Sequence, residues 1–272
     1  MQGRLSPLVM KRVQTFPVHY WKKEIYTASR VGFPQIEWTV DTPTIGNNPI
    51  LNSKGVKEIS QTCQDFGIKM NSITCDFFME NPFWLNCLLS TKDVKLIFKK
   101  LFAASEQLGE MILVIPIVDK ATLPSEDKFY EIIEVLEEVG LRDFPIRIAF
   151  ETDMRPEVIA AIIKNLPSEV YGINLDVGNS ASLGLNPNHE IETYGERIIN
   201  VHLKDRSKSG PSVKFGTGNT DFDSYIRGLL EQKYKGNLIL QSVRSKNNSH
   251  MTELIYSRKF VLDKLEMWAV SE

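Results

Sequence analysis

The sequence predicts a single α/β domain, a (β/α)8 barrel that spans residues 1–272, and three observations support this fold class. Short strand-like segments alternate with helix-like segments along the whole chain, and eight such repeats favour a closed parallel barrel. The length and the 42% hydrophobic content fit one barrel-sized domain with a large core. Polar residues collect where several apolar strands end, which is where active sites lie in such barrels. An open doubly wound sheet is the alternative, but no Gly-x-Gly-x-x-Gly motif follows the first strand, which removes the dinucleotide-binding interpretation.

The first strand is expected to be truncated at the N-terminus. Met1–Pro7 has the pattern of a strand end followed by a loop, so the front of the strand is missing. We therefore expect either an incompletely closed barrel at this point or a native start that lies upstream of Met1. Arg4 falls near the carboxyl end of this strand, although a solvated terminal arginine is the more ordinary interpretation of that residue.

Seven further strands follow from period-2 alternation or from short unbroken apolar runs. An unbroken run, as in Met111–Ile117, is typical of a strand buried on both faces. In another segment Val201 and Leu203 alternate with His202 and Lys204, which gives one short strand an apolar and a polar face. The predicted strands are Ile36–Asp41, Lys69–Cys75, Met111–Ile117, Ile146–Glu151, Tyr171–Asp176, Ile199–Arg206 and Asn237–Val243.

Helices are predicted between these strands from apolar stripes of helical period, and a glycine stands at or near the end of each of the first four. The predicted helices are Tyr20–Arg30, Asn52–Phe66, Val94–Leu108, Glu126–Val139, Pro156–Leu166, Ile191–Arg197, Phe222–Gln232 and Leu254–Trp268. Two segments are expected to be non-helical. Asp76–Met79 is expected to form an apolar loop, and Gly178-Asn179 a turn that leads the chain away from Asp176.

Three predicted strands end in residues that commonly bind metals. Glu151 and Asp176 each end an apolar strand, and His202 lies near the end of a third. Carboxylate oxygens and one imidazole make a plausible site for a divalent metal ion. For the segment around His202, an exposed edge strand with solvated charges is the alternative. Glu37 faces the expected barrel axis, where an active-site role and a structural hydrogen-bond network are both open.

Three cations fall near the carboxyl ends of the last two strands, namely Lys204, Arg206 and Arg244. Together with the backbone N–H groups of the glycine loop Gly216–Gly218, they could hold a phosphate or another anionic group. The alternatives are that Lys204 pairs with Asp205 or with a neighbouring strand's carboxylate, and that the loop is simply a turn before a capped helix.

The composition narrows the class of protein and its partners. With 32 Lys and Arg, 34 Asp and Glu and a net charge of −2, the chain has no basic excess that would favour nucleic-acid binding. Three cysteines with no zinc-like spacing argue against a disulfide framework and suggest a reducing, cytoplasmic compartment. We see no signal peptide and no long apolar run that would span a membrane. A homo-oligomer is left open.

Six segments, taken together, resemble a known family. They are Gly-Phe-Pro-Gln-Ile-Glu-Trp-Thr-Val-Asp, Ile-Ala-Phe-Glu, Leu-Asp-Val-Gly-Asn, Val-His-Leu-Lys-Asp, Phe-Gly-Thr-Gly-Asn-Thr-Asp-Phe and Tyr-Lys-Gly-Asn-Leu-Ile-Leu-Gln. Their order and span resemble the xylose isomerase-like TIM barrels known as sugar phosphate isomerases/epimerases. Within that family the segments are similar to the pentulose-phosphate and ketose 3-epimerases. The resemblance implies a role in carbohydrate metabolism.

The resemblance also implies a divalent metal ion, such as Mn, Zn, Mg or Co, at the carboxyl ends of the last four strands. Glu151, Asp176 and His202 fall on the first three ligand positions of the family. The fourth position, usually a glutamate, is Gln241 here, so one negative charge and one proton acceptor are missing. Asn179 stands where many members have a substrate-contacting histidine.

The implied chemistry passes through an enediolate of a free or phosphorylated sugar, with Glu151 as a base. Because Gln241 cannot accept a proton, a second proton carrier would have to be Glu37, Lys204 or a metal-bound water. The glutamine therefore favours aldose–ketose isomerisation over two-base 3-epimerisation. Two other functions are weighed against this one. A degenerate barrel that only binds a sugar or metabolite is kept open by Gln241, and an abasic-site endonuclease is disfavoured because the chain has only four histidines.

Overall fold

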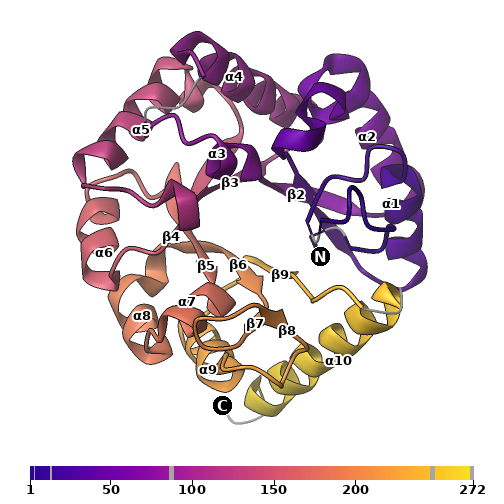
Figure 1. Cartoon of the computed structure of the whole chain (residues 1–272), viewed down its shortest axis with the longest axis vertical. Helices are drawn as coiled ribbons and strands as arrows, with labels where there is room; N and C mark the ends of the chain where they lie inside the picture. Colours follow the sequence, from indigo (N-terminus) through magenta and orange to yellow (C-terminus); the bar gives the residue numbers. More distant parts are fainter. Residues whose placement is uncertain (3, 13, 86–88, 246–248, 270–272) are drawn as a thin grey trace.

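The computed structural model describes residues 1–2, 4–12, 14–85, 89–245 and 249–269. Seven parallel strands form one curved sheet in the order β1-β2-β3-β4-β5-β6-β9, and helices surround it in a ring (Figure 1). This arrangement confirms the predicted (β/α)8 class. The strands are β1 (Gln35–Thr39), β2 (Lys69–Thr74), β3 (Met111–Ile117), β4 (Ile146–Thr152), β5 (Tyr171–Asp176), β6 (Ile198–Leu203) and β9 (Asn237–Leu240).

The first two residues stand where an eighth strand would close the barrel. Gln2 forms an isolated parallel bridge with Glu37 of β1, and the Glu37 backbone N–H donates to the carbonyl oxygen of Met1 at 2.8 Å. On the other side, the Gln2 N–H donates to the carbonyl oxygen of Leu240 at 3.2 Å. Figure 1 shows the N-terminus inside the ring of helices, beside β9. Met1 and Gln2 therefore bridge β9 and β1 by isolated backbone contacts, at the place where the first strand was expected.

The helices follow the predicted pattern with small shifts of their ends. They are α1 (Trp21–Arg30), α2 (Ser53–Phe66), α3 (Asp76–Glu80), α4 (Thr91–Leu108), α5 (Asp127–Glu138), α6 (Pro156–Lys164), α7 (Val177–Leu183), α8 (Pro187–Tyr194), α9 (Phe222–Glu231) and α10 (His250–Ala269). Polar caps set several starts, as where the Asn52 side chain accepts a hydrogen bond from the Gly55 N–H at 2.8 Å. No described helix has the length and apolar character needed to cross a membrane.

Two predicted loops are wrong, because each forms a short helix. Asp76–Met79 belongs to α3, whose residues Phe77 and Phe78 are buried against the core. Gly178-Asn179 opens α7, because the carboxylate of Asp176 caps that helix by accepting from the N–H groups of Gly178 (3.0 Å) and Asn179 (2.9 Å). The helix starts immediately after β5 and is held against the end of β6.

The segment after His202 also differs from the prediction. β6 ends at Leu203, and the next residues form β7 (Asp205–Arg206), which pairs antiparallel with β8 (Ser212–Val213) in a small hairpin. The preceding helix α8 begins at Pro187, four residues before the expected start, because Asn186 caps it through the N–H of His189 at 3.1 Å. The hairpin places Arg206 beside the end of β5.

The inside of the barrel changes from apolar to polar along its axis. Val114, Ala149 and Ile199 form a small buried apolar cluster that is separate from the larger core between sheet and helices. A pairing irregularity in β6 opposes Ile173–Asn174 of β5 with Ile198–Asn200, so Ile199 is an extra residue. Such bulges re-aim the side chains that follow them, which here are Asn200 and His202. Buried polar side chains therefore gather above the apolar cluster.

Candidate metal centre

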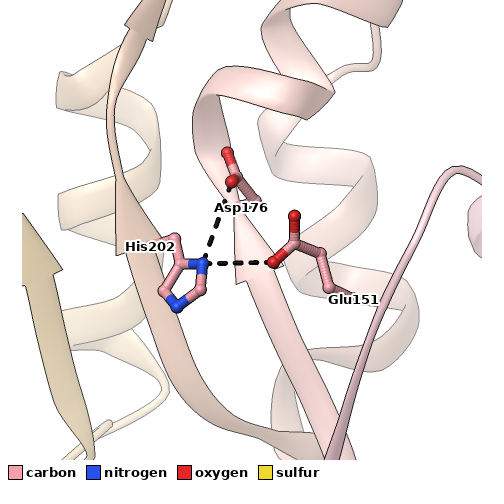
Figure 2. A group of neighbouring side chains, drawn as sticks. All are labelled: Glu151, Asp176 and His202. Carbon is pink, nitrogen blue, oxygen red and sulfur yellow. Dashed lines mark ion pairs between the residues drawn. The ribbon is translucent and has the colours of Figure 1, made fainter. Parts of the chain in front are cut away.

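Three consecutive strands bring Glu151, Asp176 and His202 together. They stand on β4, β5 and β6, and Asp176 pairs directly with His202 in the sheet register. One ligand atom from each residue lies within 4.8 Å of the others, and all three side chains are buried. The Nδ1 atom of His202 is 3.1 Å from Glu151 Oε2 and 3.9 Å from Asp176 Oδ2 (Figure 2). The sequence prediction that these three strand ends converge matches this placement.

The donor set fits a divalent cation. Two carboxylates and one imidazole supply hard oxygens and a borderline nitrogen, as zinc, manganese and similar ions prefer. Asp176 Oδ2 is buried and accepts no well-directed hydrogen bond from the described residues. Its close neighbour is the ammonium of Lys204, whose Nζ lies 2.6 Å away as an ion pair. A buried carboxylate oxygen that is balanced only by a cation is suited to metal ligation.

Gln241 reaches the same imidazole from β9. Its side chain is 4% exposed, and its Nε2 lies 2.9 Å from His202 Nδ1. The expectation that its oxygen would face the site is therefore not met, because the amide nitrogen lies against the ring nitrogen. Half a turn about the last side-chain bond would present the oxygen instead, and the position of the residue allows either donor or ligand behaviour.

Two asparagines hold the carboxylate of Glu151 from both sides. Asn174 Nδ2 donates to Oε2 at 2.8 Å, and Asn179 Nδ2 donates to Oε1 at 2.8 Å. Arg206 Nη1 in turn donates to Asn179 Oδ1 at 2.8 Å. Asn179 and Arg206 thus both lie at the site, as the sequence suggested. Asn174 was missed, although its spacing of two from Asp176 on the same strand already put both side chains on one face.

The cation cluster predicted for a phosphate is divided among different partners. Lys204 pairs with Asp176 of the neighbouring strand, which was the alternative foreseen for it. Arg244 Nη1 donates to the carbonyl oxygen of Ser6 at 2.7 Å, on the side of the barrel mouth formed by the N-terminal segment. Close packing holds Lys204 in place, because a Cβ atom at Gly178 would lie 2.3 Å from Lys204 Cγ.

The glycine loop does not offer its N–H groups to an external anion. The N–H groups of Gly216, Thr217 and Gly218 donate to Oδ2 of Asp205 at 2.9, 3.1 and 2.8 Å. The N–H of Thr220 donates to Oδ1 of the same carboxylate at 3.1 Å. The predicted phosphate-binding use of this loop is therefore wrong, because the Asp205 carboxylate is 1% exposed and takes those donors itself.

Arg4 is also placed differently from the ordinary expectation of a solvated arginine. It is only 6% exposed, and its guanidinium donates to the carbonyl oxygen of Ser242 at 2.7 Å and to Gln14 Oε1 at 3.1 Å. Burial, together with the nearby charge of Arg244, lowers the pKa of Arg4 to about 10. The N-terminal segment thus contributes a buried cation, Arg4, to the mouth of the barrel.

A second buried glutamate lies on the other side of the imidazole. Glu37 Oε1 is 2.8 Å from His202 Nε2, and the Glu37 side chain is enclosed. Burial alone would lower the pKa of His202, but the charge of Glu37 and the contact with Glu151 outweigh it and raise that pKa to about 10. Burial alone would raise the pKa of Glu37, but the charge of His202 and the hydrogen bonds to the carboxylate together outweigh it and lower that pKa below its usual value. The pair therefore favours an ionised carboxylate and a charged ring.

A further carboxyl group at the mouth was not singled out from the sequence. Asp76 follows β2, is 7% exposed, and accepts a hydrogen bond from Gln14 Nε2 at 2.6 Å. Burial, with a smaller contribution from the charge of Glu151, raises the pKa of Asp76 to about 7. A carboxyl group with such a pKa exchanges protons readily near neutral pH. Asp76 was missed because it precedes the apolar residues Phe77 and Phe78, and the segment was interpreted as a packed loop.

The larger hollows lie away from this chemistry. One of about 510 Å³ is lined by Asn71, Arg147 and Tyr234, among others, at the opposite, amino-terminal end of the strands. Beside the ligand group a small volume of about 10 Å³ is enclosed, lined by Glu151, Asp176, Asn179 and Glu190 among others. Because ligands of parallel barrels bind at the carboxyl ends, we assign the site by its side chains and not by the size of a hollow.

Comparisons with known proteins agree with this fold and site. Residues 25–259 match the family model described as a xylose isomerase-like TIM barrel. An uncharacterized protein of Methanocaldococcus jannaschii is 28% identical over 145 residues, or 50% of this chain and 47% of that protein. The provisionally named L-ribulose-5-phosphate 3-epimerase SgbU of Haemophilus influenzae is 28% identical over 98 residues, 34% of each chain. The chain thus spans about half, or less, of the length of these curated relatives.

Solved structures share the fold over most of their length. A xylose isomerase domain protein from Planctomyces limnophilus superposes with a TM-score of 0.72 at 17% identity, covering 89% of this chain and 92% of that one. The IOLI protein, solved with a zinc atom bound, gives a TM-score of 0.70 at 18% identity and covers 92% and 94%. D-Psicose 3-epimerase from Clostridium cellulolyticum H10, solved with D-tagatose, gives 0.69 at 13% identity and covers 90% and 93%.

Proposed function

Because this chain belongs to the xylose isomerase-like TIM barrel family, we propose that it is a divalent-metal-dependent isomerase or epimerase of a free or phosphorylated sugar. The observation that carries the proposal is the convergence of Glu151, Asp176 and His202 at the carboxyl ends of three consecutive strands. A metal-assisted proton transfer next to a carbonyl group needs this combination of oxygen and nitrogen ligands with a carboxylate base. Structural neighbours solved with zinc and with magnesium support a divalent metal, be it Mn, Zn, Mg or Co.

The metal would be held by Glu151, Asp176 and His202, with Gln241 as a fourth ligand through its side-chain oxygen. A bound divalent ion supplies Lewis-acid polarisation of the sugar carbonyl and stabilises negative charge on the oxygens of the enediolate. The ammonium of Lys204 now neutralises Asp176 at 2.6 Å. If a bound metal ion took over the charge of Asp176, the ammonium of Lys204 would be available to donate a hydrogen bond to a sugar oxygen.

Glu151 would take the proton from the carbon next to the carbonyl. Asn174 and Asn179 each donate to one of its oxygens at 2.8 Å, so the carboxylate is oriented before the substrate arrives. Gln241 cannot accept a proton, which favours proton transfer on one face of the enediolate and hence aldose–ketose isomerisation. Asp76 and Lys204 are the groups at the mouth that could return a proton on the other face.

The substrate would be recognised by polar side chains around the mouth. Asn179, Arg206 and Lys204 surround Glu151 and Asp176, and Arg244 lies toward the N-terminal segment. Neighbouring structures solved with D-tagatose and D-allulose support a sugar ligand. A cytoplasmic location, a homo-oligomeric state and the absence of a nucleic-acid partner stay predictions from the sequence.

The test is proton exchange in D2O with the metal-loaded protein. We expect deuterium to enter the carbon next to the carbonyl of at least one pentulose or hexulose, free or phosphorylated, and to require added metal. Glu190→Gln is a matched control for the loss of a buried carboxylate, because Glu190 accepts its hydrogen bonds from Ser180, Tyr194 and Tyr225 and from none of the ligand trio. Saturable sugar binding without any exchange would instead support the second candidate, a binding barrel that has lost turnover, which Gln241 keeps in view.

A further inference from the structure

We propose that Glu37 is a positioning residue of the metal centre, whose carboxylate holds the Nε2 proton of His202 so that Nδ1 presents its lone pair to the metal. The inference rests on the metal site of the proposed function, but not on any particular sugar. In many metal sites a carboxylate behind the ligating imidazole fixes its tautomer and orientation. Here that role falls to a residue on β1, on the far side of the barrel interior from Glu151.

The first step of the argument is the position of the two glutamates on opposite edges of one ring. Glu151 Oε2 lies 3.1 Å from Nδ1, and Glu37 Oε1 lies 2.8 Å from Nε2. Figure 2 shows the second ring nitrogen pointing away from both Glu151 and Asp176. An ionised carboxylate can only accept a hydrogen bond, so the nitrogen beside Glu37 carries the proton. The contact is an ion pair and not a well-directed hydrogen bond, because the N–H is not in line with Oε1.

The second step is that Glu37 is itself held firmly. Thr74 Oγ1 donates to Oε1 at 2.6 Å, and Asn200 Nδ2 donates to Oε2 at 3.1 Å. The residue is 1% exposed, so water does not compete for these contacts. Thr74 and Asn200 come from β2 and β6, and they anchor the carboxylate from two sides. A group fixed in this way can set the orientation of the ring that it contacts.

The third step is a second connection from Glu37 to the ligand group. The amide of Asn200 also donates to Asn174 Oδ1 at 2.7 Å, and Asn174 Nδ2 donates to Glu151 Oε2 at 2.8 Å. Glu37 is therefore linked to His202 directly and to Glu151 through two asparagines. One buried carboxylate on β1 orients two of the three proposed ligands, which stand on β4 and β6.

The same geometry argues against Glu37 as a carrier of substrate protons. Glu37 is 1% exposed and lies beneath the imidazole, while Asp176 and Lys204 lie on the mouth side. Gln241 adds no charge to the ligand group, whereas Glu37 places a third carboxylate one imidazole away from the metal. Its negative charge raises the basicity of His202 and so strengthens the bond from His202 to a metal, although Glu37 itself does not contact the substrate.

The experiment measures metal binding and not turnover. Glu37→Gln is titrated with Co²⁺ and Zn²⁺ by calorimetry, and the Co²⁺ absorption spectrum is recorded beside that of the unaltered protein. We expect the affinity to fall by about 10- to 100-fold and the Co²⁺ bands to shift, because the imidazole loses its fixed orientation. Glu190→Gln removes a buried carboxylate that is hydrogen-bonded by Ser180, Tyr194 and Tyr225 and by none of the three ligands, so it should change neither quantity.

A second variant keeps the proposal open to refutation if Glu37→Gln does not fold. Thr74→Val has nearly the same shape and removes one donor to Glu37, so we expect metal affinity to fall by about fivefold, the size of one net hydrogen bond. Unchanged affinity and an unchanged Co²⁺ spectrum in folded Glu37→Gln, or in Thr74→Val if only that variant folds, would overturn the positioning role. Proton exchange by the unaltered protein alongside those results would leave the proposed function standing. Weakened metal binding in these variants, with no proton exchange from any sugar by the unaltered protein, would support the positioning role and contradict the proposed function.

Discussion

The two sides of the His202 imidazole differ in what surrounds them, although a buried glutamate lies on each. On the Nδ1 side, Glu151 and Asp176 stand at the carboxyl ends of their strands, beside the partly accessible ammonium of Lys204. On the Nε2 side, Glu37 stands inside β1 among Thr74 and Asn200 and is 1% exposed. Under the proposed function, these two carboxylates take a reactive role and a supporting role around a single ring.

The comparison teaches that depth along a strand decides what a carboxylate can do in this barrel. Glu151 is the second-last residue of β4, at the mouth of the barrel, and is held by two asparagine amides. Glu37 is third from the end of β1, one layer deeper, where its oxygens are taken by protein donors. A chemical role is therefore expected above the ring and an orienting role below it.

The largest effect is expected from removing the reactive carboxylate. Glu151→Gln should lower proton exchange by about 10²- to 10⁴-fold, the usual contribution of a general base. Because one metal ligand is also altered, metal affinity should be measured for the same variant and saturating metal used in the exchange assay. Exchange at an undiminished rate under saturating metal would show that another residue is the base, and the proposed difference between Glu151 and Glu37 would then be wrong.

A smaller effect is expected from adding a carboxylate on the Nδ1 side. Gln241→Glu should tighten metal binding by roughly tenfold, because a charged ligand replaces a neutral amide near the cation. It should also create or raise 3-epimerase activity on a pentulose or hexulose, because a second base becomes available. Sugar chromatography and metal titration check the two outcomes separately. A variant that changes neither would show that position 241 does not belong to the ligand group.

The smallest effect is expected at Asp76, across the mouth from Glu151. Burial raises its pKa from 3.8 to about 7, so the folded protein binds this proton more tightly than the unfolded chain. The stability it contributes is therefore full below pH 3.8 and is lost as pH rises toward 7. Asp76→Asn should flatten the urea-unfolding free energy over that window and stabilise the protein at pH 8 by up to a few kcal/mol.

In the same variant, the pH profile of exchange distinguishes a proton carrier from a bystander. If Asp76 returns a proton to the enediolate, the limb of the profile near pH 7 should disappear with Asp76→Asn. A profile that keeps this limb would exclude Asp76 and leave Lys204 as the carrier on the mouth side.

Much of the barrel and the ligand trio could be predicted because each depends on local pattern. Glu151, Asp176 and His202 all follow apolar strand residues, and parallel strands bring their ends together whatever the loops do. The start of α7 was harder to predict. The Asp176 side chain lies at the site and also caps this helix, whereas the Gly178-Asn179 pair is typical of a turn.

Contacts between distant segments could not be predicted. Glu37 and His202 are 165 residues apart in the sequence, and the closed barrel places the Glu37 carboxylate beneath the His202 ring. The fold likewise brings the Asp205 carboxylate against the glycine loop, where it accepts hydrogen bonds from the loop N–H groups. These groups are therefore not available to a phosphate, although the loop has a composition typical of phosphate-binding loops. In both cases the chemical groups could be identified from the sequence, but their hydrogen-bond and ion-pair partners are determined by tertiary packing.

The most direct measurement is anomalous diffraction from crystals grown with Mn²⁺ or Zn²⁺. The account predicts one ion beside Nδ1 of His202, with oxygens of Glu151 and Asp176 at about 2.0–2.2 Å for zinc, and with Glu37 still against Nε2. An ion bound between Nε2 and Glu37, or one that leaves His202 without a bond to the metal, would contradict it.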